Sequence, residues 1–239
     1  GLQKPSLPVP DRLDDVPLHE EALVSVASDP EAQRSSVTIV RKRPADPEGR
    51  VADYRRDLVE QLAAQIANER FQTLAQKPDA KFLSAGAYSG ALNDEVETFN
   101  LAAAVPDGGI EAGLVAVATE AQRLQQFGFG APELDRAKKW MLAAYERAYA
   151  ERDKTESGSF ASEYVRHFLE DEPSPGIEYE VLVLDSGLEL VVAADVGQEV
   201  REVAPVDVAP ELGTLRRAVP AGRGRNPVVE VQGAGPVVE

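Results

Sequence analysis

The 239-residue chain contains no cysteine and only two histidines, His19 and His167. Without cysteine it can build neither a disulfide framework nor a thiolate zinc site. Two histidines are too few for a histidine-rich metal centre within this chain alone. No apolar run approaches the ~20 residues that a membrane-spanning helix needs, and the first residues lack the apolar stretch of a signal peptide. The sequence therefore predicts a globular chain with no metal site of its own.

Basic residues are also scarce. The chain has 25 lysines and arginines against 41 aspartates and glutamates, which gives a formal net charge of −16. Nucleic acids and anionic membranes are bound through basic surfaces. We therefore expect neither as a partner. The acidic surface either keeps the chain soluble or attracts basic peptide partners.

Residues 132–180 predict two consecutive helices. Pro132 suits the first position of a helix, where no backbone N–H is needed. The second helix is expected to run from about Ser157 to about Glu170, since Pro173 stops it. Apolar residues on one face of the first helix recur at helical spacing: Leu134, Ala137, Met141, Ala144, Tyr145 and Ala148.

The rest of the first 180 residues alternates between strand and helix patterns. Helices are predicted over 51–75 and 110–127, where apolar residues recur every three or four positions. Tight turns between neighbouring strands require antiparallel pairing. The element order predicts the α+β class, with an antiparallel sheet and helices packed on one face. The predicted strands cover residues 23–27, 36–43, 82–92 and 96–105.

The chain is expected to divide into three parts. Residues 1–20, rich in Pro and Asp, predict a linker or arm, and residues 21–180 predict the folded domain. Residues 181–239 contain no aromatic side chain and are rich in Val, Gly and Pro. They predict a hairpin over 180–192 and a disordered tail beyond Asp195, where a protease should cleave early.

Several segments together resemble the pitrilysin/insulinase family of zinc metallopeptidases. More narrowly, residues 8–180 are similar to the domain that follows the zinc-bearing domain in bacterial members. The resemblance rests on the order and spacing of these segments: SVASDPEA (25–32), RKRP (41–44), NERF (68–71), FLSAGA (82–87), QFGF (126–129), L-x-R-A-K (134–138), ERDKTES (151–157) and E-Y-x-R-x-F-L-x-x-E-P-x-P-G-I-E-Y-E (163–180).

The resemblance implies that catalysis belongs to another domain and that this chain is non-catalytic. The family binds zinc through an H-x-x-E-H helix motif, whose glutamate activates the bound water. This chain lacks the motif, so the resemblance implies no catalytic residue, no metal ligand and no cofactor here, with zinc in a separate catalytic domain. In that family, paired homologous halves enclose a chamber, and the companion domain forms its wall and packing surface. The implied partners are a zinc-bearing domain or subunit and, in the full enzyme, a peptide substrate, in the bacterial periplasm or cytoplasm.

One segment comes close to the zinc motif. His167-x-x-Glu170-Asp171 carries an aspartate where the second histidine should stand. We interpret His167 as a residue near an acidic cluster on a helix, because one histidine and one aspartate leave the usual three-ligand set incomplete. Two alternatives stay open, namely a self-contained hydrolase that uses His167 and an inactive structural or assembly subunit related to the family.

Two surfaces are candidates for binding. Arg41, Lys42 and Arg43 end a predicted strand and form either a solvated strand end or a basic rim that meets an acidic peptide or partner. The wide apolar stripes of the helices over 109–127 and 132–153 predict a docking patch, because one sheet need not cover both stripes completely.

Overall fold

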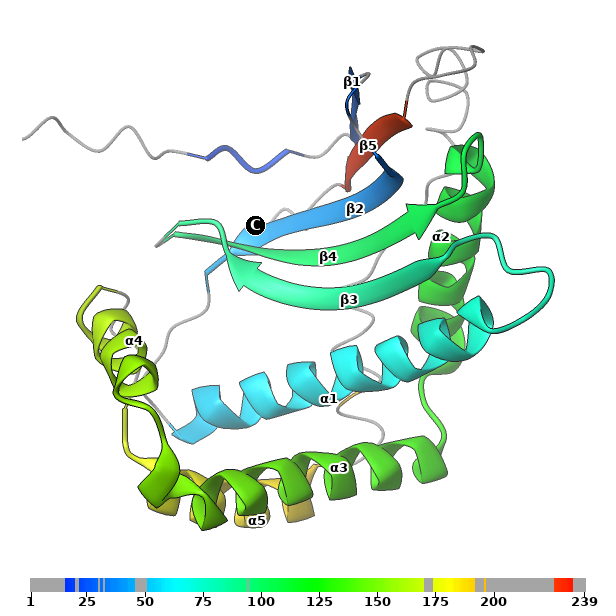
Figure 1. The fold of residues 1–239 in the computed structure, drawn as a ribbon. Helices are drawn as coiled ribbons and strands as arrows, with labels where there is room; N and C mark the ends of the chain where they lie inside the picture. The colour runs from blue at the N-terminus through cyan, green and yellow to red at the C-terminus, as the bar shows by residue number, and fades with distance from the viewer. Residues whose placement is uncertain are drawn as a thin grey trace, which may run out of the picture.

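The structure is a computed structural model that describes residues 16–19, 22–29, 31, 33–45, 51–93, 95–169, 174–191, 196 and 226–233. Strands and helices follow one another as Figure 1 shows. They are β1 (Leu23–Asp29), β2 (Ser35–Pro44), α1 (Val51–Ala75), β3 (Ser84–Ala91), β4 (Val96–Val105), α2 (Ile110–Phe127), α3 (Ala131–Ala150), the short 3-10 helix η1 (Arg152–Lys154), α4 (Ser157–Leu169), α5 (Ile177–Leu190) and β5 (Asn226–Gly233).

The strands form one sheet in the order β1-β5-β2-β4-β3. The pairs β1–β5, β2–β4 and β3–β4 are antiparallel, and β2–β5 is parallel. Figure 1 shows α1 and α3 as layers beneath β3 and β4, with α5 beside α3. The predicted α+β class, with helices on one face of a mainly antiparallel sheet, is confirmed.

The core lies between the sheet and these helices. Because side chains alternate across a strand, Val37 and Ile39 of β2 and Leu101 of β4 all turn toward the helices and are buried. They meet the apolar face of α1, where Leu58 and Ile66 have no exposed surface. Each such side chain contributes about 1.5–3 kcal/mol on leaving water. This packing fixes which face of the sheet carries the helices.

The apolar stripes of α2 and α3 lie in the core. Leu114 and Val117 of α2 and Leu134 and Met141 of α3 are buried members of the main apolar cluster. These buried residues cannot form the expected docking patch, because the sheet and the neighbouring helices cover them. Ala148, at the end of the α3 stripe, is exposed. α5 contributes to that cover, since it packs along α3.

The hairpin predicted over 180–192 is wrong. Residues 180–190 belong to α5, whose Leu184 and Leu188 are buried at helical spacing. The Asp185-Ser186-Gly187 segment, expected to turn, continues the helix. A Cβ on Gly187 would stand 3.0 Å from Cδ1 of Leu58, so the glycine permits α5 to approach α1 closely. Tertiary packing thus overrides a local Val-rich pattern that suggests strand.

The disordered tail predicted beyond Asp195 is also wrong in part. Val196 is buried, and β5 lies between β1 and β2 in the sheet. Backbone pairing with two neighbouring strands stabilises β5, and such long-range pairing leaves little local signal. The folded unit therefore extends past the expected boundary at residue 180. Most of the predicted arm, and the tail residues 192–195, 197–225 and 234–239, lie outside the described residues.

Candidate functional site

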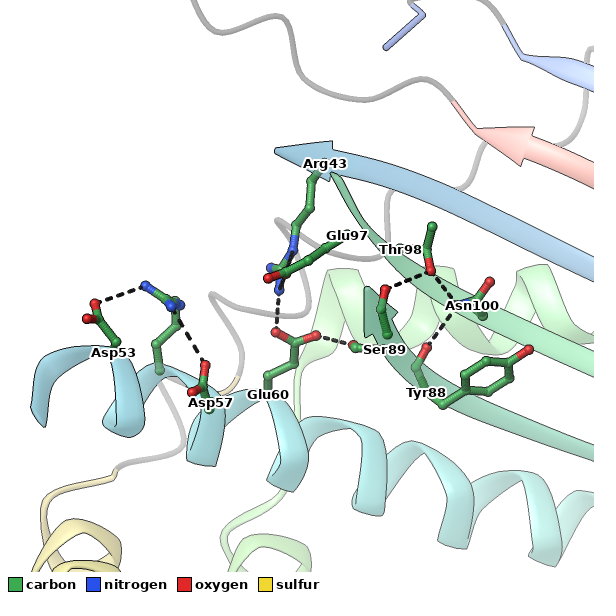
Figure 2. Close-up of polar contacts among 11 residues, drawn as sticks. Arg43, Asp53, Asp57, Glu60, Tyr88, Ser89, Glu97, Thr98 and Asn100 are labelled. Carbon is green, nitrogen blue, oxygen red and sulfur yellow. Dashed lines mark hydrogen bonds and ion pairs between the residues drawn. The ribbon is translucent and has the colours of Figure 1, made fainter. Parts of the chain in front are cut away.

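Polar side chains gather where the end of β2 passes over α1 (Figure 2). Nη2 of Arg43 on β2 donates to Oε2 of Glu60 on α1 at 2.5 Å and to Oε2 of Glu97 on β4 at 2.9 Å. The hydroxyl of Ser89 on β3 donates to the other carboxylate oxygen of Glu60. Arg43, Glu60, Ser89 and Glu97, named here the Arg43 network, thus join three strands to α1.

The Arg43 network is shielded from water. The side chains of Arg43 and Glu60 are only 17% and 10% exposed. Burial opposes the charge on Arg43, but the ion pairs with Glu60 and Glu97 outweigh it and raise the pKa of the guanidinium. Arg43 therefore stays cationic and cannot transfer protons near neutral pH. The geometry suits a contact that fixes α1 on the sheet.

The structure separates the three cations of the predicted basic rim. Arg41 and Arg43 lie on the helix side of β2, where Arg41 is buried, whereas Lys42 lies on the opposite side. Nζ of Lys42 donates to the backbone carbonyl of Pro17 at 2.9 Å. Arg41, Lys42 and Arg43 are thus not brought together on one surface. Their role toward an acidic peptide or partner stays a prediction.

A second ionic cluster ties three helices together. Arg70 of α1 donates to both carboxylate oxygens of Glu133 on α3 and, at 3.4 Å, to Oε1 of Glu120 on α2. It also donates to the carbonyl of Gly128 at 3.2 Å, and its guanidinium lies 5.4 Å from the ring centre of Phe129. These ion pairs cross between helices, which only the tertiary fold reveals.

Asn68 of α1 lies two residues before Arg70. It contacts the edge of β3 that faces away from β4. Its Oδ1 accepts from the backbone N–H of Ala87 at 2.7 Å, and its Nδ2 donates to the Ala87 carbonyl at 3.1 Å. β3 is the last strand in the sheet order and pairs only with β4. The Asn68 amide therefore satisfies one outward-facing peptide unit as a neighbouring strand would. The sequence does not predict this contact, although an asparagine within a long helix is a signal for a specific hydrogen bond.

A cavity of about 280 Å³ opens beside the Arg70 contacts. Both arginines in its wall, Arg70 and Arg136, already face carboxylates, with Arg136 at 3.8 Å from Glu69. The mixture of charges gives the cavity no preference for one sign of ligand. It is lined by Glu69, Arg70, Thr73, Leu74, Glu120, Glu133 and Arg136.

Neither histidine belongs to a metal centre that the structure describes. His19 precedes β1, and His167 lies in the last turn of α4. Glu170 and Asp171 lie outside the described residues. Within the described part of the chain, no three His, Cys, Asp or Glu residues are grouped so as to hold a metal ion. These residues therefore do not fit a catalytic zinc ion.

One face of the sheet carries no helix among the described residues. Many side chains on this face of β2, β4 and β3 are small and half-buried, for example Thr38, Val40 and Ala102. The longer side chains of Lys42 and Tyr88 lie on the same face, and Tyr88 is exposed. Figure 1 shows the helices on the other side of these strands. A face made largely of small side chains can line a wider space. Among the described helices, none has the length and apolar character to cross a membrane.

No family model matches the chain. A curated protein, the zinc protease PQQL-like from Arabidopsis thaliana, is 31% identical over 183 residues. That match covers 77% of this chain and 16% of the plant protein.

Solved structures share the fold. The periplasmic protease PqqL from Escherichia coli superimposes with a TM-score of 0.67 at 15% identity, over 85% of this chain and 21% of PqqL. The separate first half of PqqL gives 0.67 at 14% identity, over 86% of this chain and 40% of that half. An insulinase family protease from Yersinia pestis gives 0.65 at 15% identity, over 87% of this chain and 42% of that protein. The chain thus spans between 16% and 42% of the lengths of these relatives.

Proposed function

The chain belongs to the pitrilysin/insulinase family of zinc metallopeptidases, and on this basis we propose that it acts as a non-catalytic companion to a zinc-bearing domain. Its partner would carry the zinc and cleave peptides, while this chain forms part of the wall around them. The fold relationship and the small share of each relative that the chain matches support a role as one part of a larger peptidase.

The one-sided sheet is the observation that carries this proposal. A domain that must enclose a substrate needs one packed side for stability and one open side for the substrate. The helices bury one face of β2, β4 and β3, and the other face presents short side chains such as Thr38 and Ala102. An extended peptide could lie along the short side chains of this face, where Lys42 and the exposed Tyr88 would be in reach of it.

The residues of the chain also argue against catalysis by this chain alone. The family motif places two histidines within five residues. His19 and His167 are the only histidines in the sequence and lie at opposite ends of the domain sequence. The Arg43 network and the Arg70 contacts consist of mutually paired ions, which suit stability more than proton transfer.

The test is reconstitution. The 239-residue chain is mixed with a separately produced domain that carries H-x-x-E-H, taken from the gene nearest to its own. Cleavage of a long unstructured peptide should be faster in the mixture than with the zinc domain alone, and absent with this chain alone. Elemental analysis of the dialysed chain should find no stoichiometric zinc, and His167→Ala should leave that result unchanged.

Two variants distinguish a chain that lines the substrate space from one that only binds the zinc-bearing domain. Ala102→Lys alters the open sheet face, whereas Lys139→Glu alters an exposed position on α3. If the chain lines the substrate space, Ala102→Lys should change KM for the peptide, and Lys139→Glu should not. Association without any effect on cleavage would favour the second candidate, an inactive assembly subunit. Absence of association would overturn the companion role.

A further inference from the structure

α4 (Ser157–Leu169) has sharply divided faces. At 100° per residue, Phe160, Tyr164, Phe168 and Val165 fall within an arc of about 140°. The opposite arc holds Ser162, Glu163 and Arg166. Such a division is typical of a helix whose apolar side is covered.

In this domain the apolar side of α4 is not covered by the described residues. Phe160, Tyr164, Val165 and Phe168 are between 43% and 83% exposed. Among residues 157–168, whose side chains the structure describes, none belongs to the main apolar cluster or packs against it. Figure 1 shows α4 at one end of the molecule, away from the layered helices α1 and α3.

On the polar side of α4, Glu163 contacts the segment that leads into α5. The hydroxyl of Ser174, just before α5, donates to the carboxylate of Glu163. Glu163 is also less exposed than its neighbours along the helix. α4 thus differs from an ordinary surface helix, which turns its apolar side to its own core, because the apolar side of α4 is exposed.

We propose that α4 is the element through which this domain docks on the zinc-bearing domain, with its aromatic face in an apolar groove of that partner. This inference rests on the proposed function. An isolated helix of this length is marginal in water, so a covered face is what stabilises it. Anchors spaced at i, i+4 and i+8 are the pattern by which an amphipathic helix fills a groove.

Three observations favour the zinc-bearing domain as the partner of α4. The first half of PqqL extends well beyond the 40% that this chain matches, so a large part of such a half is available to contact α4. A second copy is disfavoured, because each chain carries a net charge of −16 and like-charged surfaces repel. The described parts of the C-terminal region, Val196 and β5, lie in the core and in the sheet rather than on α4.

The experiment compares two exposed phenylalanines in the full 239-residue chain. Phe168→Asp changes the α4 face, and Phe127→Asp changes the end of α2, where Phe127 is 79% exposed. Affinity for the H-x-x-E-H domain is measured by calorimetry. A buried aromatic anchor can supply much of the binding energy of an interface. Phe168→Asp should therefore raise Kd at least about 30-fold, and Phe127→Asp should change Kd less than about threefold. Both variants should melt like the wild type, since neither side chain is in the core.

Hydrogen exchange gives an independent measurement. Amides of residues 157–169 should exchange fast in the isolated chain and slowly in the mixture. Slow exchange in the isolated chain would show that another segment of this chain covers α4, and would overturn the inference. A wild-type dimer that Phe168→Asp converts to a monomer would overturn it in favour of a second copy.

The two proposals fail in different ways. If the zinc domain binds wild type and Phe168→Asp equally, the docking role of α4 is wrong and the companion role stands. If the zinc domain does not bind the wild-type chain at all, both are wrong.

Discussion

Arg70 holds Glu133 through two parallel hydrogen bonds, Nε to Oε1 at 2.7 Å and Nη2 to Oε2 at 2.8 Å. The same Oε2 accepts from the backbone N–H of Gly130 at 2.8 Å, just before α3. Bidentate pairs of this kind are the stronger form of ion pair, because two bonds fix both distance and angle. One contact therefore fixes the end of α1 against the beginning of α3 and closes the turn between α2 and α3.

Removing the cation should destabilise the domain. Arg70→Met leaves Glu120 and Glu133, both largely buried, without their shared partner. We expect a loss of about 2–3 kcal/mol in the free energy of unfolding, measured by urea denaturation. Arg123→Met is the control, because Arg123 is 60% exposed and pairs with Glu120 from the solvent side. It should cost less than about 1 kcal/mol, and equal losses for both variants would contradict the proposed clamp.

The same pair predicts a pH dependence. The hydrogen bonds from Arg70 lower the pKa of Glu133 below its ordinary value near 4.5, against the opposing effect of burial. A carboxylate with a depressed pKa in the folded state stabilises the fold above its ordinary pKa, and this stabilisation is lost as the pH falls through the folded-state value. The stability difference between wild type and Glu133→Gln should therefore be constant near neutral pH and shrink below about pH 4.5. Melting temperatures across that range test it, and a difference that grows on acidification would have the wrong sign.

Local periodicity was sufficient for the elements that the sequence predicted well. The bounds expected for α1 and β4 agree with the structure, because each carries a long pattern of one period. The sequence did not predict α5 and β5, because both depend on contacts with segments distant in sequence. Gly187 permits a close helix contact that resembles a turn signal, and β5 exists through two strands distant in sequence.

The polar contacts were predictable only in part. Strand alternation indicates that Arg41 and Arg43 share one side, but not that Glu60 of α1 lies beneath Arg43. That contact depends on the register of the sheet and on where α1 crosses it, and neither is a local property. The same holds for Asn68 and Ala87, which come from a helix and a strand.

The contact of Asn68 with β3 predicts a second stability effect. Asn68→Ala leaves the Ala87 N–H and carbonyl without their side-chain partner. The expected loss is about 1–3 kcal/mol, because both groups are part-buried. An uncovered strand edge can also pair with other chains, so light scattering during mild heating should increase. Gln72→Ala, at an exposed position of α1, is the control and should change neither quantity.

Two helix glycines should respond in opposite directions to alanine. A Cβ on Gly113 of α2 would stand 2.3 Å from Cγ1 of Val105, whereas a Cβ on Gly158 of α4 would meet nothing within 4 Å. Gly113→Ala should therefore lose about 1–2 kcal/mol despite its better helix propensity. Gly158→Ala should gain up to about 1 kcal/mol. Chemical denaturation measures both, and adding Val105→Ala to Gly113→Ala should recover part of the loss.

Truncation tests whether β5 belongs to the folded unit. A chain that ends at residue 233 keeps β5, and one that ends at residue 225 lacks it. β5 pairs with both β1 and β2, so its removal makes β2 an edge strand and takes from β1 its partner in the sheet. We expect the 1–225 chain to lose on the order of 3–5 kcal/mol and to melt about 10 °C or more below the 1–233 chain. The 1–233 chain should melt close to the full chain. If the two truncated chains melt at the same temperature, β5 contributes nothing to the sheet, and the folded unit ends before residue 226.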